Sequence, residues 1–128
     1  MPKIAIVQEP PAVLDKAATL SRAVEALKRA AGGGAELVLF PETYVPGYPA
    51  WIWRLRPDEG SIWRDIHRRL VANAVRPARG DLSPLQEAAA TRKITVVVGF
   101  HELDDAFGRT TLYNAVAVLG PALVTATT

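Results

Sequence analysis

The sequence has 128 residues, 49% of them hydrophobic and 22% charged, which is the balance of a folded globular chain and argues against a disordered one. This length suits a single domain with its own hydrophobic core. A net charge of only +2 gives no reason to expect a nucleic-acid partner. The sequence contains no cysteine, which excludes disulfides, thiolate metal sites and a thiol nucleophile within these residues.

The N-terminal segment lacks the features of a targeting or membrane segment. It has no basic region followed by a long apolar stretch and a small-residue cleavage site. No run of about 18 apolar residues, the length that a membrane span needs, occurs in the sequence. We therefore expect a cytoplasmic protein with no membrane partner.

The first part of the chain passes from a strand pattern to a helix pattern and back. Residues 3–8 form a short apolar run with β-branched residues and predict a buried strand. Asp15 is suited to cap a following helix, which the glycines at 32–34 would end. The apolar residues of that helix recur on one face: Leu20, Val24, Leu27 and Ala31. Residues 36–40 predict a second buried strand, which Pro41 ends because proline cannot donate a ladder hydrogen bond.

A long aromatic segment follows this second strand. Glu42 is thereby placed at the carboxyl end of the strand, and residues 43–60 contain Tyr44, Tyr48, Trp51 and Trp53 among prolines and glycines. A long loop of this composition is expected to line a pocket or an interface.

The second half of the chain predicts two more helices and a hairpin. Ser61 is suited to cap one helix, and the capping-box spacing of Ser83 with Gln86 opens another that runs to about residue 92. Residues 94–100 and 111–119 predict antiparallel strands joined by a turn at 104–109, with His101 and Glu102 capping the first strand. Residues 120–128 carry no charged cap or final helix, from which we expect a chain cut or altered there. The order of elements predicts an α/β layer.

Three weaker features point to ordinary surface or loop roles. His67 and His101 are the only histidines and lack ligand spacing, so no metal site is expected. The arginines between residues 54 and 79 are interpreted as a solvated helix face with some subunit contacts. The glycines at 32–34 follow a helix and precede a strand, the reverse of a phosphate-binding loop.

Residues 37–53, which read LVLFPETYVPGYPAWIW, resemble the first signature of the nitrilase branch of the nitrilase superfamily, the carbon–nitrogen hydrolases. Four further segments match landmarks of that family in the same order: residues 4–8, 34–36, 96–102 and 111–116. The resemblance implies that the chain forms the N-terminal half of an αββα four-layer sandwich, with about four strands and three helices.

The resemblance also implies roles for individual residues. Glu42 would be the general base, Tyr48 a pocket residue near the bound nitrile, and Trp53 a better candidate for the pocket wall than Trp51. Loop packing or subunit contact is the alternative role for these aromatic residues. The lysine and the cysteine that complete the family's catalytic triad would lie beyond Thr128, so residues 1–128 are expected to be an incomplete domain. None of Lys3, Lys16, Lys28 and Lys93 stands at the matching position.

The function implied is that of a nitrilase, which converts a nitrile to a carboxylic acid and ammonia by Glu-Lys-Cys covalent catalysis without a cofactor. We expect this chain to be inactive and poorly stable alone, and to self-associate as a homo-oligomer as family members do. Two alternatives remain open: a non-catalytic truncated product that associates with full-length subunits, and an amidase or cyanide-hydrating relative. The partner in a complete relative would be a small nitrile or amide.

Overall fold

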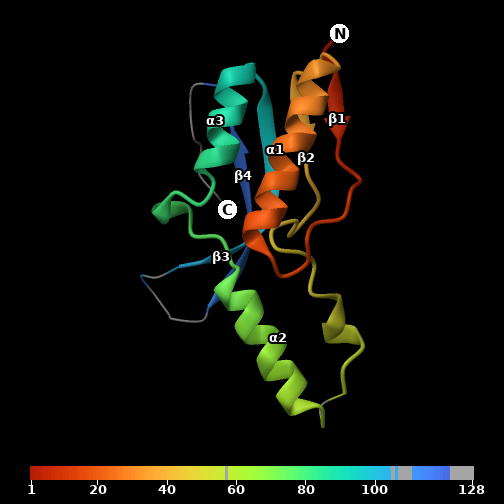
Figure 1. Ribbon diagram of the computed structural model, residues 1–128, viewed down its shortest axis with the longest axis vertical. Coiled ribbons are helices and arrows are strands. Elements are labelled where there is room, and N and C mark those ends of the chain that lie inside the picture. Colours follow the sequence, from red (N-terminus) through yellow and green to blue (C-terminus); the bar gives the residue numbers. More distant parts are fainter. Residues whose placement is uncertain (57, 105, 107–110, 122–128) are drawn as a thin grey trace.

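The computed structural model describes residues 1–56, 58–104, 106 and 111–121. Within these residues, one four-stranded sheet has the order β1 (Ile4–Ile6), β2 (Leu37–Leu39), β3 (Thr95–Leu103), β4 (Leu112–Leu119) (Figure 1). The α-helices are α1 (Lys16–Gly32), α2 (Gly60–Ala72) and α3 (Ser83–Arg92). Strands β1, β2 and β3 are parallel, and β4 is antiparallel to β3. The predicted α/β class, with four strands and three α-helices in the described part of the chain, is confirmed.

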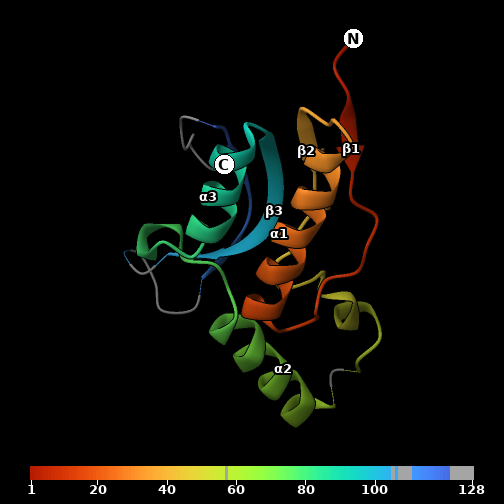
Figure 2. The same ribbon diagram turned by 45° about the horizontal axis from the view of Figure 1, so that its top comes forward.

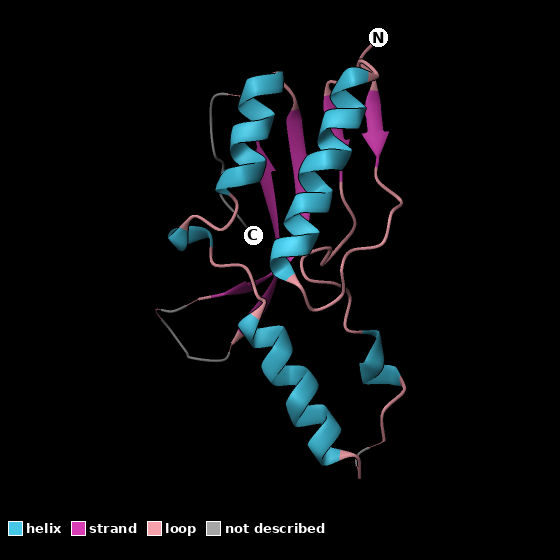
Figure 3. Ribbon diagram, in the orientation of Figure 1, coloured by secondary structure: helices cyan, strands magenta, loops and turns pink. Residues whose placement is uncertain are grey.

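Helices α1 and α3 lie side by side over the same face of the sheet, whereas α2 extends past its end (Figure 2; Figure 3). The core lies between this helix pair and the sheet, where alternate strand residues point inward. Its buried side chains include Leu27, Val38, Leu85, Val96 and Val98. Burying one such side chain contributes about 1.5–3 kcal/mol, so this layer accounts for much of the stability of the fold.

The opposite face of the sheet is apolar and open. Ile4 and Ile6 are 55% and 68% exposed, and Val116 and Val118 are each 37% exposed. Their neighbours in the strands, such as Ala115 and Ala117, point to the helices and are buried. The described residues therefore form one helix layer and one sheet, with the second face of the sheet accessible.

The predicted cap of α1 is correct, whereas the other two helix caps are wrong. Asp15 is the N-cap of α1, and its Oδ1 accepts a hydrogen bond of 3.0 Å from the amide of Ala18. Helix α2 begins at Gly60 with Glu59 as N-cap, so Ser61 lies inside the helix. Helix α3 begins at Ser83 itself, with no side-chain cap. Gln86 instead donates to the carbonyl of Gly120 at 2.8 Å, because α3 packs against the end of β4.

The predicted hairpin is confirmed, and its first strand is longer than expected. Strand β3 continues to Leu103, so His101 and Glu102 lie inside the strand and do not cap it. They pair with Asn114 and Tyr113 of β4. Most of the predicted turn at 104–109, and the predicted anomaly at the C-terminus from residue 122 onward, lie outside the described residues.

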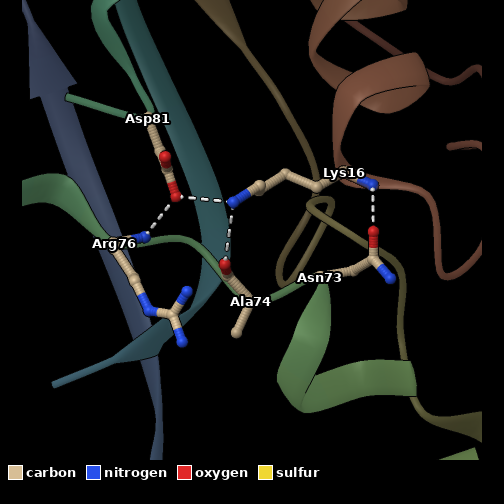
Figure 4. A network of polar contacts seen from close by, with 5 residues as sticks. All are labelled: Lys16, Asn73, Ala74, Arg76 and Asp81. Atoms are coloured by element: carbon tan, nitrogen blue, oxygen red, sulfur yellow. Dashed lines mark hydrogen bonds and ion pairs between the residues drawn. The ribbon is translucent and has the colours of Figure 1, made fainter. Parts of the chain in front are cut away.

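A polar network ties the start of α1 to the segment between α2 and α3 (Figure 4). Lys16 Nζ forms an ion pair of 2.8 Å with Asp81 and a hydrogen bond of 3.4 Å with the carbonyl of Ala74. Asp81 also accepts a 2.7 Å hydrogen bond from the amide of Arg76, and Asn73 accepts one from the amide of Lys16 at 3.1 Å. These contacts attach the C-terminal end of α2 to the helix layer formed by α1 and α3.

Among the helices described, none combines the length and the apolar composition that crossing a bilayer requires. The cytoplasmic location stays a prediction.

Candidate active site

Glu42 lies in a tight turn at the carboxyl end of β2. The amide of Phe40 still donates to the carbonyl of Val97 on β3 at 2.8 Å. The chain then turns, with the amide of Tyr44 donating to the carbonyl of Pro41 at 3.3 Å and Thr43 in the left-handed region at φ 47°. It rejoins the sheet at Val45, which bridges to Phe100. The turn therefore bulges out of the strand direction and carries Glu42 at its tip.

Gly99 in β3 makes this turn possible. A Cβ atom at Gly99 would lie 2.6 Å from the carbonyl oxygen of Pro41, 2.8 Å from the amide nitrogen of Thr43 and 2.9 Å from the Cα of Glu42. All three are backbone atoms, so no side-chain rotation could relieve the contact. The bulge can pack flat against β3 only where β3 has no side chain.

The carboxylate of Glu42 is held by β4. Asn114 Nδ2 donates to Glu42 Oε1 at 2.5 Å, across 72 positions of sequence. The nitrogen must face the carboxylate because an ionised carboxylate only accepts hydrogen bonds. Asn114 pairs with His101 in the β3–β4 ladder, so its backbone is fixed by the hairpin.

Glu42 and Asn114 line a cavity of about 430 Å³. The polar part of its wall is Glu42, Thr43, His67, His101 and Asn114. The remaining wall is apolar or aromatic: Tyr48, Pro49, Trp51, Ile52, Trp63, Leu70 and Leu112. A mainly apolar cavity with a few polar groups in its wall is typical of a small-molecule site.

His101 joins β3 to the loop that carries Tyr48. Its side chain is buried, and Nε2 lies 3.2 Å from the carbonyl oxygen of Gly47. Because a carbonyl oxygen only accepts, Nε2 carries the proton. Burial lowers the pKa of His101 below its ordinary value, and the hydrogen bond to Gly47 opposes that shift without cancelling it.

The structure brings together two of the three predicted site residues. Glu42 and Tyr48 line the same cavity. Trp53 does not line it and is 79% exposed, whereas Trp51 lines it. Both belong to the 3₁₀ turn η1 (Ala50–Trp53), and residues two positions apart in such a turn face different directions. The chemical roles of Glu42, Tyr48 and Trp53 stay predictions.

Sequence reasoning did not identify Asn114, Trp63 or His101 as site residues. The predicted hairpin could have indicated Asn114, because the pairing of β4 with β3 brings this position to the end of the sheet where β2 also ends. Trp63 carried no signal, because its place in the wall depends on how α2 packs beyond the sheet.

The described residues place neither a cluster of metal ligands nor a lysine or arginine in the wall of the cavity. No group of three or more potential metal-binding side chains occurs among them. The cavity wall contains no lysine or arginine within the described part. Lys3, Lys16 and Lys28 are bonded elsewhere, to the carbonyl of Gly33, to Asp81 and to Glu25 respectively. Within the described part of the chain, Glu42 therefore shares the cavity wall with no lysine or arginine.

Comparison with known proteins agrees with this geometry. The sequence model of the family described as "Carbon-nitrogen hydrolase" matches residues 3–123. An arylacetonitrilase of Arthroderma benhamiae is 35% identical over 119 residues, covering 93% of this chain and 33% of the relative. An aliphatic nitrilase of Rhodococcus rhodochrous is 36% identical over 104 residues, covering 81% of this chain and 27% of the relative. The chain thus spans about a third or less of the curated relatives that it matches.

A solved structure shares the fold. The amidase of Nesterenkonia sp. AN1 in complex with butyramide superposes with a TM-score of 0.65 at 22% identity, covering 98% of this chain and 41% of the amidase. At that identity the likeness concerns the fold alone, and it matches the expected partial sandwich. The match of the family model to residues 3–123 shows that this chain belongs to the carbon–nitrogen hydrolase family.

Proposed function

We propose that this chain supplies the general base and one wall of the substrate pocket of a nitrilase, an enzyme that converts a nitrile to a carboxylic acid and ammonia. The observation that carries the proposal is that Glu42 lines a cavity whose wall also includes Tyr48, Trp51 and Trp63. The sequence similarity to relatives named as nitrilases supports the same reaction.

Nitrile hydrolysis by this route requires a base, a thiol and a cation. Glu42 takes the proton of a thiol, and the thiolate attacks the nitrile carbon to form a thioimidate. Water then adds, ammonia leaves, and a second water releases the carboxylic acid from the acyl-enzyme. A cation near the nitrile nitrogen stabilises the negative charge that develops in the attack. Of these groups, the chain contributes the base.

The thiol must come from outside these 128 residues, since they contain no cysteine. We propose that the cation does too, because no lysine or arginine lines the cavity in the described part of the chain. The purified chain is therefore expected to bind a nitrile without hydrolysing it. Release of ammonia by the chain alone would contradict a thiol-dependent mechanism.

A chimera tests the function directly. The residues of this chain replace the matched third of the Arthroderma benhamiae arylacetonitrilase, which then supplies the remainder of the domain. We expect the chimera to release ammonia from phenylacetonitrile, and Glu42→Gln to reduce kcat by about 10²–10⁴-fold. Glu36→Gln is the matched control, because Glu36 is an exposed glutamate just before β2 and does not line the cavity. A chimera that folds with equal activity in both variants would refute the role of Glu42.

An amidase is the second candidate, because the same base and thiol hydrolyse an amide and the solved relative with this fold is an amidase. The aromatic wall favours a substrate with a ring, which fits phenylacetonitrile better than a short aliphatic amide. The chimera discriminates the two when phenylacetonitrile, phenylacetamide and butyramide are compared by kcat/KM.

A non-catalytic truncated product that associates with full-length subunits, through its open sheet face, is the third candidate. Exposed Ile6 and Val116 support it, since an apolar sheet face of this kind favours association. Analytical ultracentrifugation of the chain should show self-association that Val116→Lys weakens and that Ala90→Lys, on exposed α3 surface, leaves unchanged. A monomer at all concentrations would exclude self-association through this face.

A further inference from the structure

We propose that Asn114 is the positioning residue of the general base: it holds Oε1 of Glu42 and leaves Oε2 as the oxygen that accepts the proton of the thiol. This inference rests on the function proposed for Glu42. The Asn114 Nδ2 to Glu42 Oε1 hydrogen bond, at 2.5 Å, is the observation from which it starts.

The division between the two carboxylate oxygens follows from the contacts of the site. Within the described residues, Glu42 Oε1 accepts from Asn114, and no side chain or backbone group is bonded to Oε2. The side chain of Glu42 is exposed, so without Asn114 its rotamers would be free to interchange. Oε2 is therefore the oxygen open to a reacting group in the cavity.

Asn114 itself is anchored more firmly than the residue it holds. It lies in the β3–β4 ladder, two positions from the end at Leu112, in register with buried His101. The next residue along β4, Ala115, is buried against the helix layer. The amide is thus presented from a rigid strand, whereas Glu42 sits at the tip of a turn.

A neutral amide suits a carboxylate that must change its protonation state. When the thiol S–H bond breaks and the proton moves to Oε2, Oε1 becomes the carbonyl oxygen of a carboxylic acid. Asn114 can donate to Oε1 in both states, because a carboxylate oxygen and a carbonyl oxygen both accept. A lysine or arginine in its place would favour the ionised form and oppose the transfer. The electron pair left on sulfur attacks the nitrile carbon, and the proton on Oε2 remains available for the departing ammonia.

The test measures the coupling between the two side chains by NMR on the purified chain, without any nitrile. We expect Glu42→Gln to shift both side-chain amide proton signals of Asn114. Glu102→Gln, the same chemical change on β3 at a residue in register with Tyr113, should leave those signals in place. Equal effects of the two substitutions would overturn the proposal.

A second measurement follows the rotamer of Glu42. In the unchanged chain, the side-chain carbons of Glu42 should show a single restricted rotamer by scalar couplings and relaxation. Asn114→Leu, which has a similar shape and no donor, should convert this to rotamer averaging, and Asn114→Gln, which keeps the amide donor, should restore part of the restriction. The backbone amide signals of β3 and β4 report whether each variant is folded. A Glu42 side chain that averages equally in the unchanged chain and in Asn114→Leu would refute the positioning role.

These measurements separate the inference from the proposed function. An intact Glu42–Asn114 coupling in a chain whose chimera lacks nitrile hydrolysis would reject the function and leave the pairing. An active chimera whose Glu42 is uncoupled from Asn114 would reject the positioning role alone.

Discussion

Gly99 of β3 leaves room for the backbone at Glu42, since a Cβ at Gly99 would lie 2.9 Å from the Cα of Glu42. The glycine in β3 thus determines how closely the turn bearing the carboxylate can approach the sheet. The missing side chain at Gly99 therefore allows the turn to hold Glu42 in its present position.

Substituting Gly99 should therefore cost stability and displace Glu42. Gly99→Ala would force the turn at 41–43 away from β3, at a cost of about 1–3 kcal/mol in the free energy of unfolding. The displaced carboxylate should also lose the hydrogen bond from Asn114, seen as a shift of the Asn114 side-chain amide signals. Urea unfolding gives the first quantity and NMR the second. Gly32→Ala is the matched control, since nothing lies within 4 Å of a Cβ there, and it should be neutral or stabilising.

The ion pair between Lys16 and Asp81 is expected to stabilise the attachment of α2 to the helix layer. Burial alone would raise the pKa of Asp81, but the hydrogen bonds from Lys16 and from the amide of Arg76 outweigh it and the net pKa is lowered. Asp81→Ala should lower the free energy of unfolding by about 1–2 kcal/mol at pH 7. The lowered pKa means that this stability is present above the unfolded-state value, about 3.9, and is lost as the pH falls through the folded-state pKa.

Urea unfolding at neutral and acid pH checks this behaviour, and a second ion pair provides the control. Glu25 and Lys28 form an exposed pair on α1, with side chains 62% and 43% accessible. Glu25→Ala should change the free energy of unfolding by no more than about 0.5 kcal/mol. An equal loss in the two variants would mean that the Lys16 network adds nothing beyond a surface contact.

Stability should also depend on the buried imidazole of His101. Burial lowers its pKa in the folded chain, so the unfolded chain binds more protons once the pH falls towards about 6.5. The free energy of unfolding should be fully retained above that value and decline as the pH falls through the lowered folded-state pKa. His101→Gln should flatten this part of the profile, whereas His67→Gln, at an exposed position on α2, should leave it unchanged. A profile that keeps its slope in His101→Gln would contradict this assignment.

The sequence predictions are accurate where the interacting residues are close in the sequence, and they fail where those residues are far apart. The β-branched run at 4–7 and the cap by Asp15 are local features, and the structure has both nearly where the sequence puts them. Ser61 and Ser83 have the sequence pattern of helix caps, yet both lie inside the helices, which begin at Gly60 and Ser83 without a side-chain cap. The pairing of Asn114 with Glu42 spans 72 positions and requires the register of β3 with β4, which no local pattern contains. The family resemblance located Glu42, and only the packed fold could identify its partner.

The three tryptophans give a last test, which concerns the pocket itself. Trp51 and Trp63 line the cavity, and Trp53 is exposed and outside it. Titration of the chain with phenylacetonitrile should therefore move the indole N–H signals of Trp51 and Trp63 and leave that of Trp53 in place. Trp51→Leu should weaken binding by about 1 kcal/mol or more through lost aromatic contact, and Trp53→Leu should not. A ligand that shifts Trp53 most would support the role that the family resemblance implies for Trp53 and place the binding site on the outer side of η1.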